Sequence, residues 1–104
     1  SETFRRYPDP LYIKDREFRY LYVNDAFARY MGREPSELYG KDDFALLPEK
    51  AAQICRSNDV RLFANENRET TRVWESEETI EFEGSVRSLV VRRYLLRDSS
   101  DTPY

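Results

Sequence analysis

Apolar and polar side chains alternate twice near the start of the chain. The segment LYIKD alternates, and after DREF the stretch RYLYVN alternates again, with Leu21 and Val23 on one face and Tyr20 and Tyr22 on the other. Alternation with a period of two is typical of strands that bury one face. The two segments therefore predict a β-hairpin.

Signals for short helices follow this hairpin. Asn24 and Asp25 offer N-cap oxygens to DAFARYM, and Gly32 supplies a left-handed stop about two turns later. Pro35 opens a second helix, PSELY, which ends at Gly40, and KDDFALL has room for about one more turn. The sequence therefore predicts three short helical pieces in a row.

A longer helix is predicted to start at Pro48, run through EKAAQICRSNDVRLFA and end at Asn65. Its less polar positions recur at intervals of three and four, which is typical of a helix with one buried face. This stripe consists of Ala51, Ile54, Cys55, Asn58 and Leu62. Asn58 is a polar amide within the stripe, so it has to bond the backbone, a water or a ligand.

The last part of the chain returns to a period of two and predicts a long hairpin that turns at Glu83 and Gly84. A three-residue loop would place Phe82 opposite Val86, whereas a two-residue loop would place Phe82 opposite Ser85. The first register pairs apolar with apolar side chains. We therefore expect the three-residue loop.

The returning strand, SVRSLVVRRYLL, is apolar on both faces. Leu89, Val91 and Leu95 differ in parity from Val86 and Val90, and we expect these three to form the outer face of the sheet. An exposed apolar stripe of this length is a liability in a monomer, so a second chain or a flanking helix should cover it. The sequence therefore predicts a homodimer through the outer sheet face.

Composition narrows the class of protein. The 104 residues, 39% of them hydrophobic, suffice for one compact domain. The net charge of -3 gives no electrostatic reason to expect nucleic acid or an anionic membrane as a partner. No apolar run approaches the roughly 20 residues of a membrane span, so we expect a soluble, cytoplasmic domain without membrane insertion. Met31 is the only methionine, which indicates a piece of a larger protein.

An ordered series of residues runs through these elements. It consists of Asp15, Asn24, Phe27, Gly32, Glu37, Leu38, Gly40 and Lys41. With these residues in this order, the first part of the chain resembles the opening of a PAS sensor domain, over the stretch IKDREFRYLYVNDAFARYMGREPSELYGKDDFALLP. The second part is similar to the end of that family, over the stretch ETIEFEGSVRSLVVRRYLLRDSSDTPY. The resemblance covers the chain from about Pro8 to Tyr104.

The resemblance implies an α+β fold, with a PAS-like antiparallel sheet of order 2-1-5-4-3 covered on one face by short helices and one longer helix. We expect residues 1–104 to be a single PAS-type domain. The family's fifth strand is missing, because the sequence stops in the turn RDSSDTPY. Either the natural chain continues into this strand or a segment of another chain fills the gap between the first and fourth strands.

Candidate catalytic and cofactor groups are few. The chain has no histidine, which removes the usual axial ligand of haem and histidine acid/base chemistry. The light-sensing flavin subclass carries a cysteine before the long helix, whereas Cys55 lies inside the helix and is interpreted as a small buried residue. Asp15 and Asn24 are interpreted as turn and cap residues. We expect no catalytic site, no metal, no haem and no covalent flavin.

Adjacent carboxylates and the arginines of the last strand are interpreted as surface residues. Asp42 with Asp43 and Glu77 with Glu78 are adjacent carboxylates that point in different directions, so we expect helix-start charge and solvated positions. Four arginines make the last strand basic, and they should pair with glutamates across the hairpin rather than hold an anionic ligand. They are Arg87, Arg92, Arg93 and Arg97.

The best site hypothesis is a pocket. In PAS domains the helices cover one sheet face and can leave a cavity, which here would hold a small organic ligand. The residues that would line it by position are Leu21, Val23, Phe27, Met31, Leu38, Phe44, Cys55, Asn58, Leu62, Trp74, Ile80 and Val90. Most of them are ordinary core residues, and Asn58 is the polar exception.

The resemblance implies a sensory or dimerisation module of a signalling protein, such as a histidine kinase or a diguanylate cyclase. A ligand or partner that favours one arrangement of the sheet would bias an output helix. Two alternatives stay open: a ligand-free interaction scaffold and a small enzyme. An apolar cavity with one unsatisfied polar group favours the sensor, a packed core favours the scaffold, and converging titratable groups favour the enzyme.

Overall fold

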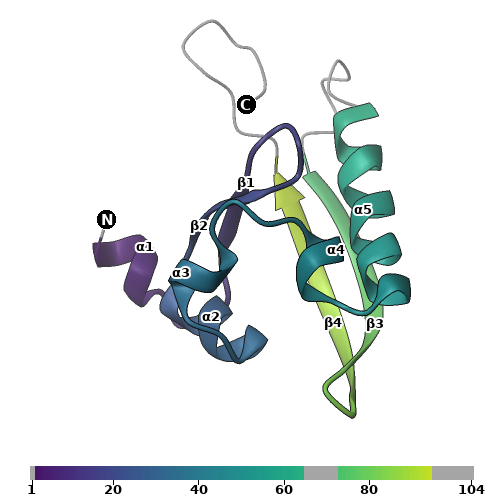
Figure 1. The fold of residues 1–104 in the computed structure, drawn as a ribbon. Coiled ribbons are helices and arrows are strands. Elements are labelled where there is room, and N and C mark those ends of the chain that lie inside the picture. Colours follow the sequence, from purple (N-terminus) through teal and green to yellow (C-terminus); the bar gives the residue numbers. More distant parts are fainter. Residues whose placement is uncertain (1, 65–72, 95–104) are drawn as a thin grey trace, which may run out of the picture. The chain divides into compact units, whose positions relative to one another are not determined.

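The computed structural model describes residues 2–64 and 73–94 (Figure 1). The chain divides into two compact units, an N-terminal unit of residues 1–46 and a C-terminal unit of residues 47–104. The chain contains helices together with antiparallel strands, which confirms the α+β class. The prediction of one domain over residues 1–104 stays a prediction.

The N-terminal unit contains a short hairpin and four short helices. Its core is formed by the buried side chains of the second strand and of the helices that follow it. The elements are α1 (Glu2–Arg6), β1 (Tyr12–Lys14), β2 (Tyr20–Val23), α2 (Asp25–Met31), α3 (Pro35–Leu38) and α4 (Asp43–Leu46). The predicted hairpin and the three short helical pieces after it are therefore confirmed.

The faces of β2 differ from the predicted alternation. Tyr20 and Val23 are buried, whereas Leu21 and Tyr22 are exposed. The pairing of β1 with β2 shifts between Ile13 and Lys14. Such a bulge interrupts the period of two, so residues three apart can share the buried face. The prediction that Leu21 and Val23 lie on one face is wrong for this reason.

The side chain of Asn24 forms hydrogen bonds both with the segment before β1 and with the start of α2. Its Oδ1 accepts hydrogen bonds from the backbone N–H groups of Leu11 and Phe27, both at 2.9 Å. Its Nδ2 donates to the carbonyl oxygens of Tyr7, at 3.2 Å, and Asp9, at 2.8 Å. The side chain is fully buried. The predicted N-cap is confirmed, and the same amide also holds the incoming chain.

The turn between β1 and β2 is organised by Asp15. Its Oδ1 accepts hydrogen bonds from the backbone N–H groups of Glu17, at 2.9 Å, and Arg19, at 3.0 Å. These bonds fix a turn in which Phe18 has a φ of 63°, in the left-handed region. The interpretation of Asp15 as a turn residue is confirmed.

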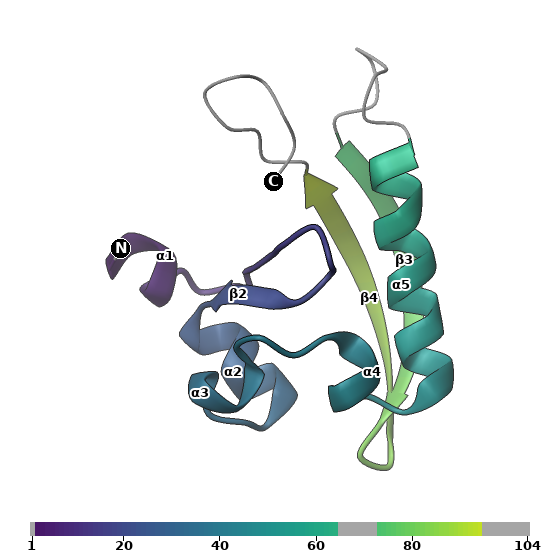
Figure 2. The same cartoon turned by 45° about the horizontal axis from the view of Figure 1, so that its top comes forward.

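The C-terminal unit consists of one long helix and one long hairpin. They are α5 (Glu49–Ala64), β3 (Val73–Phe82) and β4 (Ser85–Tyr94). The helix lies along the two strands (Figure 2) and contacts both. The predicted long helix and long hairpin are confirmed, while the predicted helix end at Asn65 and the strand residues beyond Tyr94, Leu95 among them, lie outside the described residues.

The register of the long hairpin is the two-residue one. Phe82 pairs with Ser85, and Ile80 pairs with Arg87. The turn residues Glu83 and Gly84 have φ values of 49° and 77°. Two successive left-handed residues make the type of turn whose twist matches that of the strands. The predicted three-residue loop is wrong, because turn geometry outweighs the pairing of apolar side chains.

This register also reverses the predicted faces of β4. Arg93 contacts Asp59 of α5, so Val91, which shares the parity of Arg93, lies on the face of β4 toward the helix. Val86 and Val90 have the other parity and are 71% and 62% exposed. The outward-facing valines are therefore Val86 and Val90. The sequence predicted Val91 on the outer face, and this prediction is wrong.

Two separate two-stranded sheets are present among the described residues, β1 with β2 and β3 with β4. Neither β1 nor β4 pairs with a strand of the other sheet within this part of the chain. The sheet order 2-1-5-4-3 and the place of a fifth strand stay predictions.

Candidate functional site

Four of the six predicted pocket residues in the N-terminal unit are buried. They are Val23, Phe27, Met31 and Leu38. The rings of Phe27, Tyr12 and Tyr20 lie 5.3 to 5.4 Å apart between centroids and form an aromatic cluster. The other two predicted residues, Leu21 and Phe44, are each 42% exposed.

The predicted residues of α5 lie together on its buried face. Cys55, Asn58 and Leu62 are all buried. The Nδ2 of Asn58 donates to the carbonyl oxygen of Ile54 at 3.1 Å, so the backbone alternative is the one observed for this amide. Asp59 is buried beside them, whereas Ile54, predicted for the stripe, is half-buried.

The remaining predicted residues belong to the hairpin. Trp74 and Ile80 belong to β3. Their side chains lie outside the described part of the chain. Val90 lies on the opposite face. A pocket that draws on both units stays a prediction.

The most distinctive chemistry of the C-terminal unit is a buried cluster of three charged side chains, which we call the Arg93 triad. The Nε of Arg93 donates to Asp59 Oδ1 on α5 at 2.9 Å. Its Nη1 and Nη2 donate to Glu78 Oε2 and Oε1 on β3 at 2.8 and 3.3 Å. All three residues are at most 5% exposed. One guanidinium on β4 thereby joins α5 to both strands of the hairpin.

Cys55 adds a weaker contact to the triad. Its Sγ lies 3.8 Å from Glu78 Oε1, within reach of an S–H donor to a carboxylate. Ala51 and Cys55 of α5 form a small apolar cluster with the half-buried Leu47, which precedes the helix. The predicted burial of Cys55 is confirmed, and its thiol also has a polar neighbour.

The energetics of such a triad favour a role in specificity over one in stability. Removing charges from water costs several kcal/mol per ion, which their mutual attraction offsets only when the geometry is good. The bidentate contact to Glu78 and the third bond to Asp59 provide that geometry. Buried ion pairs are best attested as devices that fix a register or a switch. The Arg93 triad therefore links α5 to both strands of the hairpin through oriented bonds, and a role in fixing how the helix lies on the hairpin is the hypothesis that follows.

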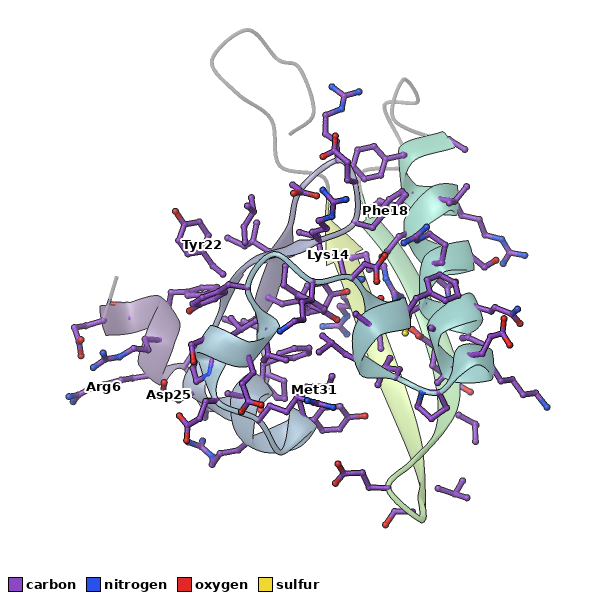
Figure 3. The ribbon with its side chains drawn as sticks, viewed as in Figure 1. Arg6, Lys14, Phe18, Tyr22, Asp25 and Met31 are labelled. Carbon is purple, nitrogen blue, oxygen red and sulfur yellow. The ribbon has the colours of Figure 1, made fainter. Side chains whose placement is uncertain are left out.

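A second buried ion pair lies in the N-terminal unit. Lys14, labelled in Figure 3, donates from Nζ to Asp43 Oδ2 at 2.6 Å, and the Tyr20 hydroxyl donates to Asp43 Oδ1 at 2.5 Å. The ammonium also lies 5.2 and 5.0 Å from the ring centroids of Tyr12 and Tyr20. These contacts join α4 to the β1–β2 hairpin.

Sequence reasoning missed the three buried carboxylates of Asp43, Asp59 and Glu78. Asp43 and Glu78 were predicted to be solvated, but they are 2% and 3% exposed. Their neighbours fit the prediction: Asp42 accepts from the N–H of Ala45 at the start of α4, and Glu77 is exposed. The available signal was parity, because Glu78 shares the face of Trp74 and Ile80 in the predicted strand.

The described ranges 2–64 and 73–94 contain neither a metal-binding cluster nor a membrane-spanning helix. No three His, Cys, Asp or Glu side chains gather there as a metal site would require. No helix in this part of the chain is long and apolar enough to cross a bilayer.

Sequence comparisons identify relatives of the chain. The sequence model of the family described as PAS fold matches residues 4–100. Among curated proteins, the uncharacterised protein y4lL of Sinorhizobium fredii is 34% identical over 87 residues, which make up 83% of this chain and 10% of that protein. The chain thus spans about a tenth of the length of this relative.

Solved structures show the same fold. The PAS domain of a protein from Colwellia psychrerythraea is similar with a TM-score of 0.76 and 14% identity, over 98% of this chain and 83% of that chain. The PAS domain of BvgS from Bordetella pertussis has a TM-score of 0.72 and 21% identity, over 98% of this chain and 74% of that chain. These likenesses concern the fold alone.

Proposed function

Since the chain belongs to the PAS fold family, a general fold of signalling sensors, we propose that it is a sensory module that binds a small ligand or a partner protein and mediates dimerisation. It regulates an output domain, such as a histidine kinase or a diguanylate cyclase, and acts in the cytoplasm. The module itself is not an enzyme.

The Arg93 triad is the observation that supports this proposal most strongly. A sensor needs an element with two arrangements whose balance a ligand can change. In the triad, α5 and the hairpin are joined by oriented bonds of one guanidinium, and not by apolar contacts alone. A ligand that shifts α5 would exchange or break these bonds, which makes the hairpin respond to the helix.

Native mass spectrometry of the freshly purified protein tests ligand binding. We expect a species heavier than the polypeptide by the mass of a small organic molecule, and loss of this mass on denaturation. The same preparation should show no haem or flavin absorption, because there is no histidine for haem and no cysteine in KDDFALLP for flavin. A bare polypeptide mass would contradict ligand binding.

A ligand-free scaffold is the second candidate, and one observation favours it. The amide of Asn58, the polar group expected to be available on the α5 face, donates to the backbone of its own helix. A scaffold would show the bare mass together with a stable dimer. Sedimentation of the same sample therefore separates the two candidates.

A further inference from the structure

The side chain of Asp43 attaches α4 to the β1–β2 hairpin. Asp43 is the first residue of α4, and Leu46, its last residue, is the other buried side chain of this helix. Phe44 and Ala45, which lie between them, are exposed. Among residues 2–46, no other element packs broadly against α4. The position of α4 therefore depends strongly on the bonds of one carboxylate.

Both oxygens of this carboxylate are bonded to side chains of the hairpin. Oδ2 accepts a hydrogen bond from the ammonium of Lys14, and Oδ1 accepts one from the hydroxyl of Tyr20. The side chains of Lys14 and Asp43 are only 8% and 3% exposed. The ammonium also lies close to the rings of Tyr12 and Tyr20, which is favourable for a cation. We call the three side chains of Lys14, Tyr20 and Asp43 the Asp43 latch.

The groups of the Asp43 latch are stable when bonded and stable when hydrated, and arrangements between these two are unfavourable. If Asp43 moves away slightly, the Lys14 ammonium and the Tyr20 hydroxyl lose this acceptor while they are still buried. A buried charge or hydroxyl that lacks a partner is costly. The separated groups become stable only once water reaches them. The helix α4 therefore either stays bonded or moves far enough to admit water.

The backbone just before α4 is held to β2 by bonds of its own. The Gly40 N–H donates to the carbonyl oxygen of Tyr20 at 2.8 Å, and the Tyr20 N–H donates to the carbonyl oxygen of Lys41 at 3.0 Å. Neither of these backbone bonds involves a side chain of the Asp43 latch. Gly40 and Lys41 can therefore stay on β2 when the latch opens, and the moving part begins at Asp42.

We propose that α4 is a gate beside the aromatic cluster of Tyr12, Tyr20 and Phe27, and that the Asp43 latch holds it closed. The bond to Asp43 fixes the ring of Tyr20, whose centroid lies 5.4 Å from that of Phe27. When the latch opens, this ring is free to turn. Phe27, a buried residue of the predicted pocket, then becomes accessible.

The role of the gate as an entrance for a small ligand rests on the proposed function. The opening itself does not, and it is measured without any ligand. A bare polypeptide mass in native mass spectrometry would contradict ligand binding, whereas the absence of an opening would contradict the gate. The two failures are therefore distinguishable.

Hydrogen exchange of the unaltered chain, followed by NMR, tests the opening. The probes are the Lys14 ammonium and the Tyr20 hydroxyl, and the reference is the buried Phe27 N–H, which is bonded to Asn24. We expect both latch groups to have protection factors at least about tenfold below that of the Phe27 N–H, since a local opening is more populated than global unfolding. Latch protons that exchange as slowly as the Phe27 N–H would overturn the gate.

Asp43→Asn shows whether α4 itself moves, because it keeps the shape of the side chain and removes its charge. We expect the population of the open state to rise at least about tenfold, since the buried ammonium loses its carboxylate. Nitrogen-15 relaxation dispersion and saturation transfer should then give one common exchange rate for the amides of α4 and none for Gly40. Exchange confined to Lys14, or lower stability without exchange in α4, would contradict the gate.

The matched control is Asp42→Asn, which removes the neighbouring charge and keeps an oxygen for the N–H of Ala45. It should leave the open population unchanged. Lys14→Met combined with Asp43→Asn should open the gate no more than either change alone, because both break the same latch. Additive effects would contradict the latch, and the exchange of the unaltered chain decides the matter even if these variants unfold.

Discussion

Asn24 shows how much of the N-terminal unit depends on one side chain. Two backbone N–H groups and two carbonyl groups bond to its amide, and none of the amide is exposed. We expect Asn24→Ala to lower the free energy of unfolding by about 2–4 kcal/mol, since the cap and the buried partners are lost together. Chemical denaturation measures the change. Gln53→Ala removes an exposed amide from α5 and is the control, so equal effects of the two variants would contradict this role.

A second prediction at the scale of residues concerns the contribution of Arg93 to stability. Arg93→Met leaves Glu78 and Asp59 buried without their cation, and should destabilise the protein by about 3–5 kcal/mol. Replacing all three residues, by Arg93→Met, Glu78→Leu and Asp59→Leu, should recover most of this loss because no buried charge remains.

Denaturation of the same variants shows whether the triad acts as a unit. Arg92→Met, on the exposed face of β4, is the control and should change stability by less than about 0.5 kcal/mol. A triple variant as unstable as Arg93→Met would show that the three side chains are not an isolated charge cluster.

Local bonding could be predicted from the sequence, whereas long-range pairing could not. Asp15 and Asn24 bond backbone groups near them in the chain, so their roles follow from residue type and position. Glu78 and Asp59 are 15 and 34 residues from Arg93. The parity that Glu78 shares with Trp74 and Ile80 distinguishes it from its exposed neighbour Glu77. The pairing of Glu78 with Arg93, however, depends on the register of the hairpin, which the sequence did not predict.

At the scale of elements, the turn of the β3–β4 hairpin contains a residue ill suited to its backbone. Glu83 has a φ of 49°, which asparagine and glycine adopt more readily. We expect Glu83→Asn to raise the free energy of unfolding by about 0.5–1 kcal/mol. Thermal unfolding measures the change, with Glu77→Asn on β3 as the control. If Glu83→Asn lowered the free energy of unfolding as much as Glu77→Asn does, the assigned turn type would be contradicted.

The same turn shows why the sequence predicted the bounds of the elements better than the register of the hairpin. Helix and strand bounds follow from caps, glycines and periodicity, and these agree with the structure for α2 and for the start of α5. Register depends instead on the φ values of Glu83 and Gly84, and faces follow from register. One residue of difference in the loop therefore moved Val90 and Val91 to opposite faces from those predicted.

At the scale of the whole molecule, the exposed valines of β4 are where the proposed dimer can be tested. Val86 and Val90 are 71% and 62% exposed on the face of the hairpin away from α5. If two chains pair through this face, Val90→Glu should weaken the dimer at least about tenfold, because a charge would be buried. Sedimentation measures the dissociation constant. Val60→Glu, at an exposed valine of α5, is the control, and equal dimerisation of all forms would contradict this interface.

The central claim is that the Arg93 triad makes α5 and the β3–β4 hairpin respond to each other. Amide hydrogen–deuterium exchange of the unaltered protein and of Arg93→Met, with Arg92→Met as the control, tests it most directly. We expect Arg93→Met to speed exchange in α5 and in both strands together, and Arg92→Met to leave all three unchanged. Faster exchange in β4 alone, with α5 as protected as before, would contradict the claim.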